Sequence, residues 1–429
     1  MHRVVISLAV MLGAGTGAAV AQDSAAVLRV TLTDAIQRAL EADPDMVSAT
    51  GVRRTASADQ VSVLGSFLPD LRFTATASQN SQPRFQEGSS VPIPPIPNYR
   101  TSFSAGVDLF TGFRRLANLR AAGATVRAAD AGIVTRRYET RFATQQAFYL
   151  AIATEDLVRV AEAGVRRAQQ QLQISVEKLR AGSATRSDSL RSTVGYGNAR
   201  ILLLQALANR ATAGANLARQ IGVNEPVLAV ADTALPALPD TGVVRRMALE
   251  SAPQVQQADA QLQAAKASVW SARSPYIPTV NLSLGSSRND TIFGNALVAN
   301  EVHNWSVGLS WALFDRFGRE EANTQARVRR DNAVAVAADT RRGVSAQMTQ
   351  QLATLATTFE QIEIARATLA AATEDLRVQQ ERYRVGAATI LDLLTSQEAL
   401  TQAEVDVVSR RFNYLNARAQ VEALIGRTL

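Results

Sequence analysis

The sequence predicts a mainly α-helical chain with a small β portion, built from two copies of one unit. Three observations support this fold class. One motif recurs at a constant spacing, one proline-free segment is far longer than the helices of globular domains, and four short segments alternate apolar with polar residues. Together they favour an elongated, duplicated chain over a compact globular domain.

The duplication is visible at a spacing of 204 residues. Leu179-Arg180-Ala181-Gly182 corresponds to Tyr383-Arg384-Val385-Gly386, and Asp188 corresponds to Asp392. Solenoid repeats are only a few tens of residues long, so we interpret this pattern as a duplicated domain. The chain then divides into a first repeat over residues 22–222, an inter-repeat linker over 223–242 and a second repeat over 243–429.

Residues 1–21 are expected to form a secretory signal peptide. An arginine is followed by the apolar run Val4–Leu12 and by the small-residue site Ala19-Val20-Ala21. The alternative, a transmembrane anchor, is disfavoured because the apolar run is too short. No later segment approaches the roughly 20 apolar residues of a spanning helix, so strands would have to make any membrane crossing.

The composition excludes several classes of function. Cysteine is absent, which removes disulfides and thiolate metal sites. The formal charge is +7, but basic residues are interspersed with acids, which indicates solvated helix faces rather than a nucleic-acid site. Lys178 and Lys266 are the only lysines, and His303 is the only histidine after the signal peptide. With no phosphate-binding loop either, we expect no catalysis, cofactor or metal site.

Each repeat begins with a helical region and continues with two strands. Residues 33–66 and 243–274 are rich in alanine and glutamine, and Pro44 and Pro253 suit the first turn of a second helix. The alternating segments predict strands near 70–78, 102–110, 279–285 and 304–312. The segments 83–98 and 286–304, which lie between the paired strands, are predicted loops.

The predicted strands have unlike faces. One face carries small polar residues and the other carries phenylalanine, valine, leucine and tryptophan, as in strands between a wet lumen and lipid. A hairpin packed on a soluble core would show the same alternation, so the strands alone leave both alternatives open. Trp305 and Trp311 suit interfacial anchors or core packing. Four strands cannot close a barrel, so a membrane location would require several chains.

Long helical hairpins follow the strands. Thr111–Leu179 contains no proline and would reach about 100 Å as a helix. A heptad series indicates a coiled-coil seam in the second copy: Leu355, Ile362, Leu369, Leu376 and Tyr383. Gly182 and Gly386 suit left-handed caps that end the outgoing helices, and return helices are expected over about 186–221 and 390–425.

These motifs resemble the outer-membrane efflux proteins of the TolC type. The resemblance rests on residues 383–394, on Arg180-Ala181-Gly182 with Asp188, and on Leu32–Ile36 leading to Pro44. It covers nearly the whole mature chain. It implies a homotrimer in the lipid bilayer of the cell outer membrane, with four strands per chain closing a 12-stranded barrel and the helices forming a periplasmic tunnel.

The resemblance also implies function and partners. A TolC-type protein is the exit duct of a tripartite efflux or type I secretion system, and it passively conducts what an inner-membrane pump delivers through a periplasmic membrane-fusion adaptor. It implies that the hairpin tips contact the adaptor, here at Gly182, Gly386, Arg180 and Val385. The competing hypothesis is a periplasmic coiled-coil scaffold or adaptor without a pore.

Three further residues take roles from the resemblance. Asp188 and Tyr383 match a pair that latches the closed tip, and Asp392 matches an acidic ring that narrows the pore. The sequence departs from the family pattern at two positions. Ala388 replaces an arginine that reinforces the latch in family members, and Thr395 replaces an acidic residue that forms their second ring. Both aspartates also suit helix caps, because acids are favourable in the first turn of a helix, and this alternative stays open.

Overall fold

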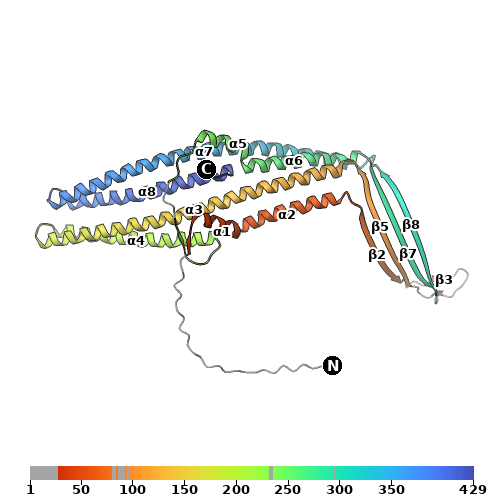
Figure 1. Ribbon diagram of the computed structural model, residues 1–429, viewed down its shortest axis with the longest axis horizontal. Helices are drawn as coiled ribbons and strands as arrows, with labels where there is room; N and C mark the ends of the chain where they lie inside the picture. The colour runs from red at the N-terminus through yellow and green to blue at the C-terminus, as the bar shows by residue number, and fades with distance from the viewer. Residues whose placement is uncertain (1–27, 80–83, 86–91, 94–96, 231–234, 294–295) are drawn as a thin grey trace, which may run out of the picture.

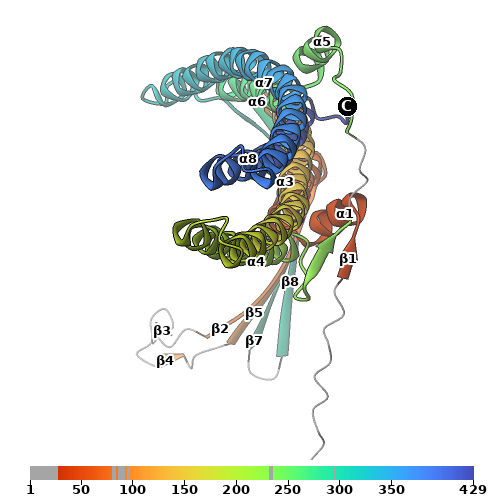
Figure 2. The ribbon, with the colours of Figure 1, turned by 90° about the vertical axis from the view of Figure 1, so that its left-hand side faces the viewer.

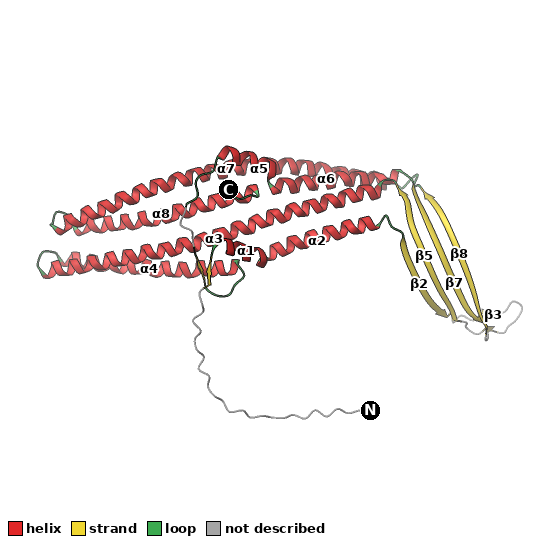
Figure 3. Cartoon of the chain, viewed as in Figure 1, coloured by secondary structure: helices red, strands yellow, loops and turns green. Residues whose placement is uncertain are grey.

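A computed structural model of the chain describes residues 28–79, 84–85, 92–93, 97–230, 235–293 and 296–429. The predicted signal peptide lies outside the described residues. The molecule is elongated, with helices over most of its length and a four-stranded sheet at one end (Figures 1 and 3). The helices are α1 (Leu32–Ala42), α2 (Pro44–Gly65), α3 (Arg114–Arg180), α4 (Arg186–Gln220), α5 (Thr241–Ser251), α6 (Pro253–Arg273), the 3-10 helix η1 (Ser274–Tyr276), α7 (Gly318–Arg384) and α8 (Ile390–Ile425). The predicted mainly helical fold is confirmed.

The two long helices show the duplication most clearly. Helices α3 and α7 have 67 residues each, and their first and last residues are related by the same spacing of 204. At 1.5 Å per residue, each extends about 100 Å. Both follow a phenylalanine with a left-handed backbone, Phe113 and Phe317, each at φ 67°. Each long helix then turns and continues into a return helix, α4 or α8, which packs along it (Figure 1).

The sheet contains four antiparallel strands in the order β2-β5-β7-β8. Their bounds are β2 (Asp70–Gln79), β5 (Pro97–Thr111), β7 (Thr279–Phe293) and β8 (Ala296–Ser310). Within the described residues, β2 and β8 have a strand partner on one side only. The sheet edges are therefore open in a single chain.

The loop predicted over 286–304 is wrong. Strands β7 and β8 stay paired from Thr279 opposite Ser310 to Phe293 opposite Ala296, so His303 lies in β8. The apolar alternation that guided the prediction stops near Gly285, but backbone pairing does not require apolar side chains. Cross-strand partners such as Arg288 and Glu301, which form a 3.2 Å ion pair, support the polar continuation.

The register aligns like residues into rows across the sheet. Leu71, Ala105, Leu284 and Trp305 are consecutive partners in one row. The next row contains Arg72, Ser104, Gly285 and Asn304. Because successive side chains point to opposite faces, one face of the sheet is largely apolar and the other polar in the half nearer the helices. Leu71 and Trp305 are more than half exposed, so no part of the same chain covers the apolar face there.

Two small strand pairs were not expected from the sequence. Strand β1 (Leu28–Val30) pairs in parallel with β6 (Val227–Ala229), and β3 (Arg84–Phe85) pairs with β4 (Pro92–Ile93). Strand β6 lies inside the segment predicted as the inter-repeat linker. Strands of two or three residues are too short to show a periodic pattern, so sequence periodicity could not find them.

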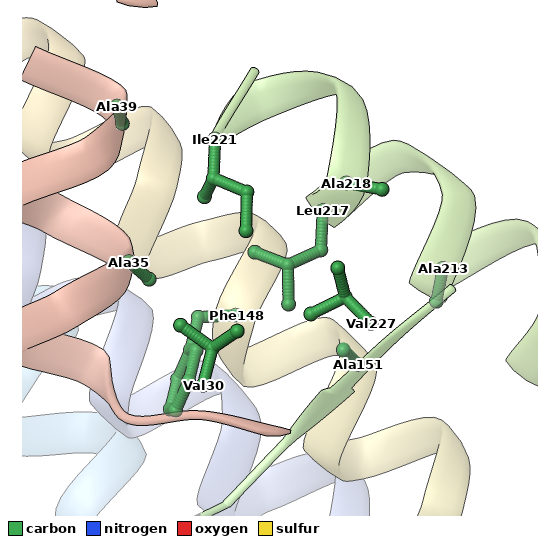
Figure 4. Packing of buried hydrophobic residues seen from close by; sticks show 10 residues of the cluster. All are labelled: Val30, Ala35, Ala39, Phe148, Ala151, Ala213, Leu217, Ala218, Ile221 and Val227. Carbon is green, nitrogen blue, oxygen red and sulfur yellow. The ribbon is translucent and has the colours of Figure 1, made fainter. Parts of the chain in front are cut away.

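The core is divided among small clusters along the helices. Figure 4 shows the cluster in which β1, β6, α1, α3 and α4 meet, with Phe148 and Leu217 fully enclosed. A second cluster surrounds Tyr414 and Met348 between α5, α7 and α8. Many of the other buried residues are alanines. Small side chains let helix backbones approach closely, so a layer of helices can be stable without one central core.

The helices form a curved layer. Figure 2 shows α7, α8, α3 and α4 following one another around an arc, with α1, α5 and β1 on its convex side. The packing agrees with this order, because α8 contacts both α7 and α3, and α3 contacts α4. Helices α7 and α4 therefore form the two ends of the arc within one chain.

Candidate functional site at the hairpin tips

Each hairpin tip is a turn between an outgoing and a return helix. In the first, the Gly182 N–H donates to Leu179 O at 3.0 Å and the Ser183 N–H donates to Lys178 O at 2.9 Å. Gly182 has φ 73°, a left-handed conformation that favours glycine. This pair of bonds is the Schellman motif, which satisfies the last carbonyls of a helix.

The second tip has the same backbone. The Gly386 N–H donates to Tyr383 O at 3.3 Å, the Ala387 N–H donates to Arg382 O at 2.7 Å, and Gly386 has φ 79°. An added Cβ would meet no atom within 4 Å at Gly182 or Gly386. Backbone conformation, rather than lack of space, is therefore the reason for glycine at both tips.

The return helices begin with matching capping boxes. In α4, the Thr185 N–H donates to the Asp188 carboxylate at 2.9 Å and the Asp188 N–H donates to the Thr185 hydroxyl at 3.2 Å. In α8, Thr389 and Asp392 make the equivalent bonds at 2.9 and 3.3 Å. The Thr389 backbone N–H and then its hydroxyl hold the pKa of Asp392 below its ordinary value. Both aspartates therefore act as caps, the alternative that the sequence had left open.

Tyr383 belongs to an apolar cluster at the second tip. Only 8% of it is exposed, and it packs with Leu376, Ile390, Leu393 and Leu400. No hydrogen bond joins its hydroxyl to Asp188 in the described part of the chain. The structure thus does not bring the predicted latch pair together within one subunit, and the latch remains a hypothesis for the assembled protein.

Lys178 occupies the position beside Tyr383 instead. Its Nζ donates to the backbone oxygen of Tyr383 at 2.6 Å and lies 4.1 Å from the centre of the tyrosine ring. The sequence interpretation assigned no role to Lys178. The available signal was its rarity, since it is one of two lysines in a chain whose other basic side chains are nearly all arginine.

The predicted adaptor contacts lie on the surface. Arg180 and Val385 are exposed, and Val385 keeps 69% of its surface accessible. An apolar side chain at the end of a hairpin that its own chain leaves largely uncovered is available for an intermolecular contact. The two glycines expose their backbone beside these side chains.

A second link between the hairpins lies farther from the tips. Arg167 of α3 donates to both carboxylate oxygens of Glu404 in α8, at 2.7 and 3.0 Å, and to the Thr401 hydroxyl at 3.3 Å. Both charged side chains are about one-fifth exposed. A cavity of about 940 Å³ lies beside this ion pair, between α3, α4 and α8.

The structure gives no support for a metal centre or a membrane-spanning helix. Across the described ranges, no group of three histidine, aspartate or glutamate side chains is placed to hold a metal ion. In the same part of the chain, no helix has both the length and the apolar character needed to cross a membrane.

Solved outer membrane channels share the whole architecture. The fold of CusC superposes with a TM-score of 0.81 over 92% of this chain and 92% of that chain, at 16% identity. The open-state structure of the outer membrane channel MtrE of Neisseria gonorrhoeae gives a TM-score of 0.77 over 92% and 89%, also at 16% identity. At this level of identity the likeness establishes the fold, which is that of TolC-type channels.

The sequence itself establishes the family. Residues 35–223 and 244–427 match the family described as outer membrane efflux protein, and this chain belongs to that family. The efflux protein BepC of Brucella suis is 26% identical over 77% of this chain and 75% of BepC. The pyoverdine export protein OpmQ of Pseudomonas aeruginosa is 27% identical over 92% of this chain and 85% of OpmQ. The predicted family, outer membrane location and efflux function are confirmed.

Proposed function

We propose that three copies of this chain form a passive exit duct across the outer membrane and the periplasm. The observation that carries this proposal is the four-stranded sheet, which is open at both edges and has one apolar and one polar face. A sheet edge in lipid leaves backbone groups without partners, so the edges need neighbouring chains. Three sheets would close a 12-stranded barrel with its apolar face toward lipid.

The helical layer supports the same assembly. Helix α4 presents Leu190, Val194, Ile201 and Leu204 along one stripe, and each is more than half exposed. At the other end of the arc, the half of α7 nearer the tip exposes Ile364 and Val378. Packing α4 of one chain against α7 of the next would cover both surfaces and close the arc into a tunnel.

The hairpin tips are the proposed docking end of this tunnel. Exposed Arg180 and Val385, next to Gly182 and Gly386, would contact a periplasmic membrane-fusion adaptor, which links the duct to an inner-membrane pump. The pump supplies the energy, and the duct performs no catalysis. The names of relatives include pyoverdine export, cobalt-zinc-cadmium resistance and toluene efflux. We therefore assign cargo selection, whether for efflux or type I secretion, to the pump.

The tip is also the proposed gate. Asp392 would contribute to a ring that narrows the pore, and Asp188 would bond the Tyr383 hydroxyl in the closed state. One oxygen of Asp188 accepts the Thr185 N–H, and its second oxygen is left to accept the tyrosine. Tyr383→Phe removes the hydroxyl and should raise the single-channel conductance. An unchanged conductance would leave Asp188 with the capping role alone.

Conductance across a planar lipid bilayer tests the duct. The purified mature protein should give channel events, whereas a scaffold without a pore would give none at any voltage. Ile201→Asp places a charge in the α4 stripe and should abolish trimers and channels. Asn216→Asp, an exposed polar position near the end of the same helix, is the matched control and should preserve both. Channel events from a monomeric Ile201→Asp protein would contradict the proposed assembly.

Adaptor docking is tested separately by cross-linking. The chain contains no cysteine, so a cysteine introduced at Val385 provides a single reactive thiol. It should trap the adaptor in cells, and a cysteine at Asn216 should not. Equal capture at both positions would contradict docking at the tips.

A further inference from the structure

We propose that Lys178 joins the two hairpin tips of one chain and thereby stabilises the closed tip of the duct. The inference deepens the proposed gate and rests on the proposed function. It begins from the ends of α3 and α7, which run in the same direction from the sheet to the tips (Figure 1). The C-terminal end of each helix carries partial negative charge. Two such ends brought together repel each other unless a cation lies between them.

The Lys178 ammonium group is that cation. It lies in the last turn of α3, and its Nζ contacts the last-turn carbonyl of Tyr383 in α7 at 2.6 Å. The charge also faces the tyrosine ring at 4.1 Å, a favourable cation–π geometry. Lys178 is half-buried and Tyr383 is buried, so water screens this contact less than it would an exposed pair.

The backbone holds the lysine in place. The carbonyl of Lys178 accepts the Ser183 N–H at 2.9 Å and the Ser183 hydroxyl at 3.1 Å, which fixes this residue within the first tip. The ring of Tyr383 is fixed by its own apolar cluster. A contact between two positions that are already ordered costs little further conformational entropy.

The duplication shows that this contact occurs once in each chain. At the spacing of 204 residues, Lys178 corresponds to Arg382 and Tyr383 corresponds to Leu179. Arg382 donates to Ala387 O of its own tip at 3.3 Å rather than to another hairpin. If neighbouring chains repeat the arrangement, the junction between them pairs an arginine with a leucine, which has no aromatic ring.

The second link between the hairpins also has no counterpart in the other repeat. Arg167 and Glu404 join α3 to α8, eleven residues before Lys178, or about 16 Å along the helix. Their counterparts in the other repeat are Ala371 and Arg200, which cannot form an ion pair. Both polar links therefore hold the hairpins of one chain together, and neither has an equivalent at a junction between chains.

Amine acetylation of the wild-type trimer tests the contact without any variant. Mass spectrometry measures the acetylation of each lysine separately. Lys266, which is exposed on α6, is the internal control. A hydrogen bond to a charged group should slow acetylation of Lys178 about tenfold relative to Lys266. Equal rates for the two lysines would overturn the proposed contact.

Spin labels at Ser183 and Ala387 test whether Lys178 holds the two tips of one chain at a fixed distance. Labelled chains diluted with unlabelled ones report only the distance within one chain. The wild-type distribution should be narrow and should broaden in Lys178→Met, while Lys266→Met should leave it unchanged. A broad wild-type distribution, or one that Lys178→Met does not alter, would overturn the inference.

Conductance separates this inference from the proposed function. Lys178→Met should raise the single-channel conductance, and Lys178→Arg, which keeps the charge and its donors, should raise it less. Tyr383→Phe keeps both groups that Lys178 contacts, so it tests the Asp188 latch independently. Absence of channels in the wild type would contradict the duct itself. Channels with equal conductance in wild type and Lys178→Met would contradict only the role of Lys178.

Discussion

The two hairpin tips have the same backbone but different interiors. Both end in a Schellman turn and restart with a capping box. The second tip encloses Leu376, Tyr383, Ile390, Leu393 and Leu400. The corresponding positions of the first tip are Leu172, Leu179, Arg186, Ser189 and Tyr196, so polar residues replace part of the apolar set.

The polar interior of the first tip is itself hydrogen-bonded. Gln171 donates to the Ser175 hydroxyl at 3.1 Å, and Ser175 lies 2.8 Å from Ser192 across the hairpin. In the second tip, Ser396, the counterpart of Ser192, donates instead to Asp375, the counterpart of Gln171, at 2.6 Å. The same turns and caps therefore form around an apolar or a polar interior. The two tips differ in their buried side chains and not in their backbone.

The position of each return helix explains the difference. Helix α8 packs between α7 and α3, whereas α4 lies at the end of the arc (Figure 2). The apolar residues of α4 face outward for a neighbour, and those of α8 face its own chain. Within one chain, the return helix of the second hairpin is therefore covered on both sides, whereas that of the first keeps an exposed apolar stripe.

The largest expected effect is at the apolar interior of the second tip. Tyr383→Ala removes a buried aromatic side chain and should lower the free energy of local opening by about 3 kcal/mol. Leu179→Ala, at the corresponding and more exposed position, should lower it by about 1 kcal/mol. Hydrogen exchange of the amides at the ends of α7 and α3 measures both. Equal losses would show that the two interiors do not differ in stability.

The next effect concerns the ion pair of Arg167 with Glu404, which joins the two repeats. Arg167→Met leaves Glu404 without its partner and should destabilise the contact between α3 and α8 by about 2 kcal/mol, less than for a fully buried pair. Arg366→Met breaks the exposed Arg366–Glu363 pair within α7 and should cost about 0.5 kcal/mol or less. Hydrogen exchange in α8 measures the first, with α7 as the comparison. A similar loss in both variants would contradict a specific role for Arg167.

The sequence predicted the parts of this comparison that depend on local chemistry. The glycines with positive φ, the prolines at the first turns of α2 and α6, and the long proline-free helices follow from single residues or short periods. The spacing of 204 residues gave matching bounds for α3 and α7. Capping by Asp188 and Asp392 was one of two alternatives, because an acid in the first turn is compatible with a cap or a site.

The remaining parts depend on contacts distant in sequence. Lys178 meets a residue 205 positions away, and Arg167 meets Glu404 across 237 positions. No periodic pattern contains such pairs. The extension of β7 and β8 was missed for a related reason, since their polar outer halves are held by backbone pairing and by cross-strand pairs such as Arg288 with Glu301.

A smaller effect tests the shared backbone of the tips. Gly182→Ala and Gly386→Ala each place a Cβ in open space at positive φ, so each should cost about 1 kcal/mol from conformation alone. Gly222→Ala should cost more, because its Cβ would also lie 2.5 Å from Ala42 Cβ. Hydrogen exchange in the last turns of α3, α7 and α4 measures the three changes. Unequal costs at the two tips would show that their turns are not equivalent.

The smallest expected effect is the pH dependence of the second capping box. Because the folded-state pKa of Asp392 is lowered, chiefly by the Thr389 N–H, its carboxylate stabilises the start of α8 above the ordinary aspartate pKa of about 3.9. That contribution is lost as the pH falls through the lower folded-state value. Asp392→Asn should therefore weaken the protection of the first turn of α8 against hydrogen exchange at pH 6. The difference from wild type should vanish at a pH below the folded-state pKa of Asp392.

Glu398→Gln is the control, because Glu398 is exposed on the same helix and has no partner among the described residues. It should show no such difference. A gap between Asp392→Asn and wild type that persists at acidic pH would mean that the carboxylate charge does not hold the cap.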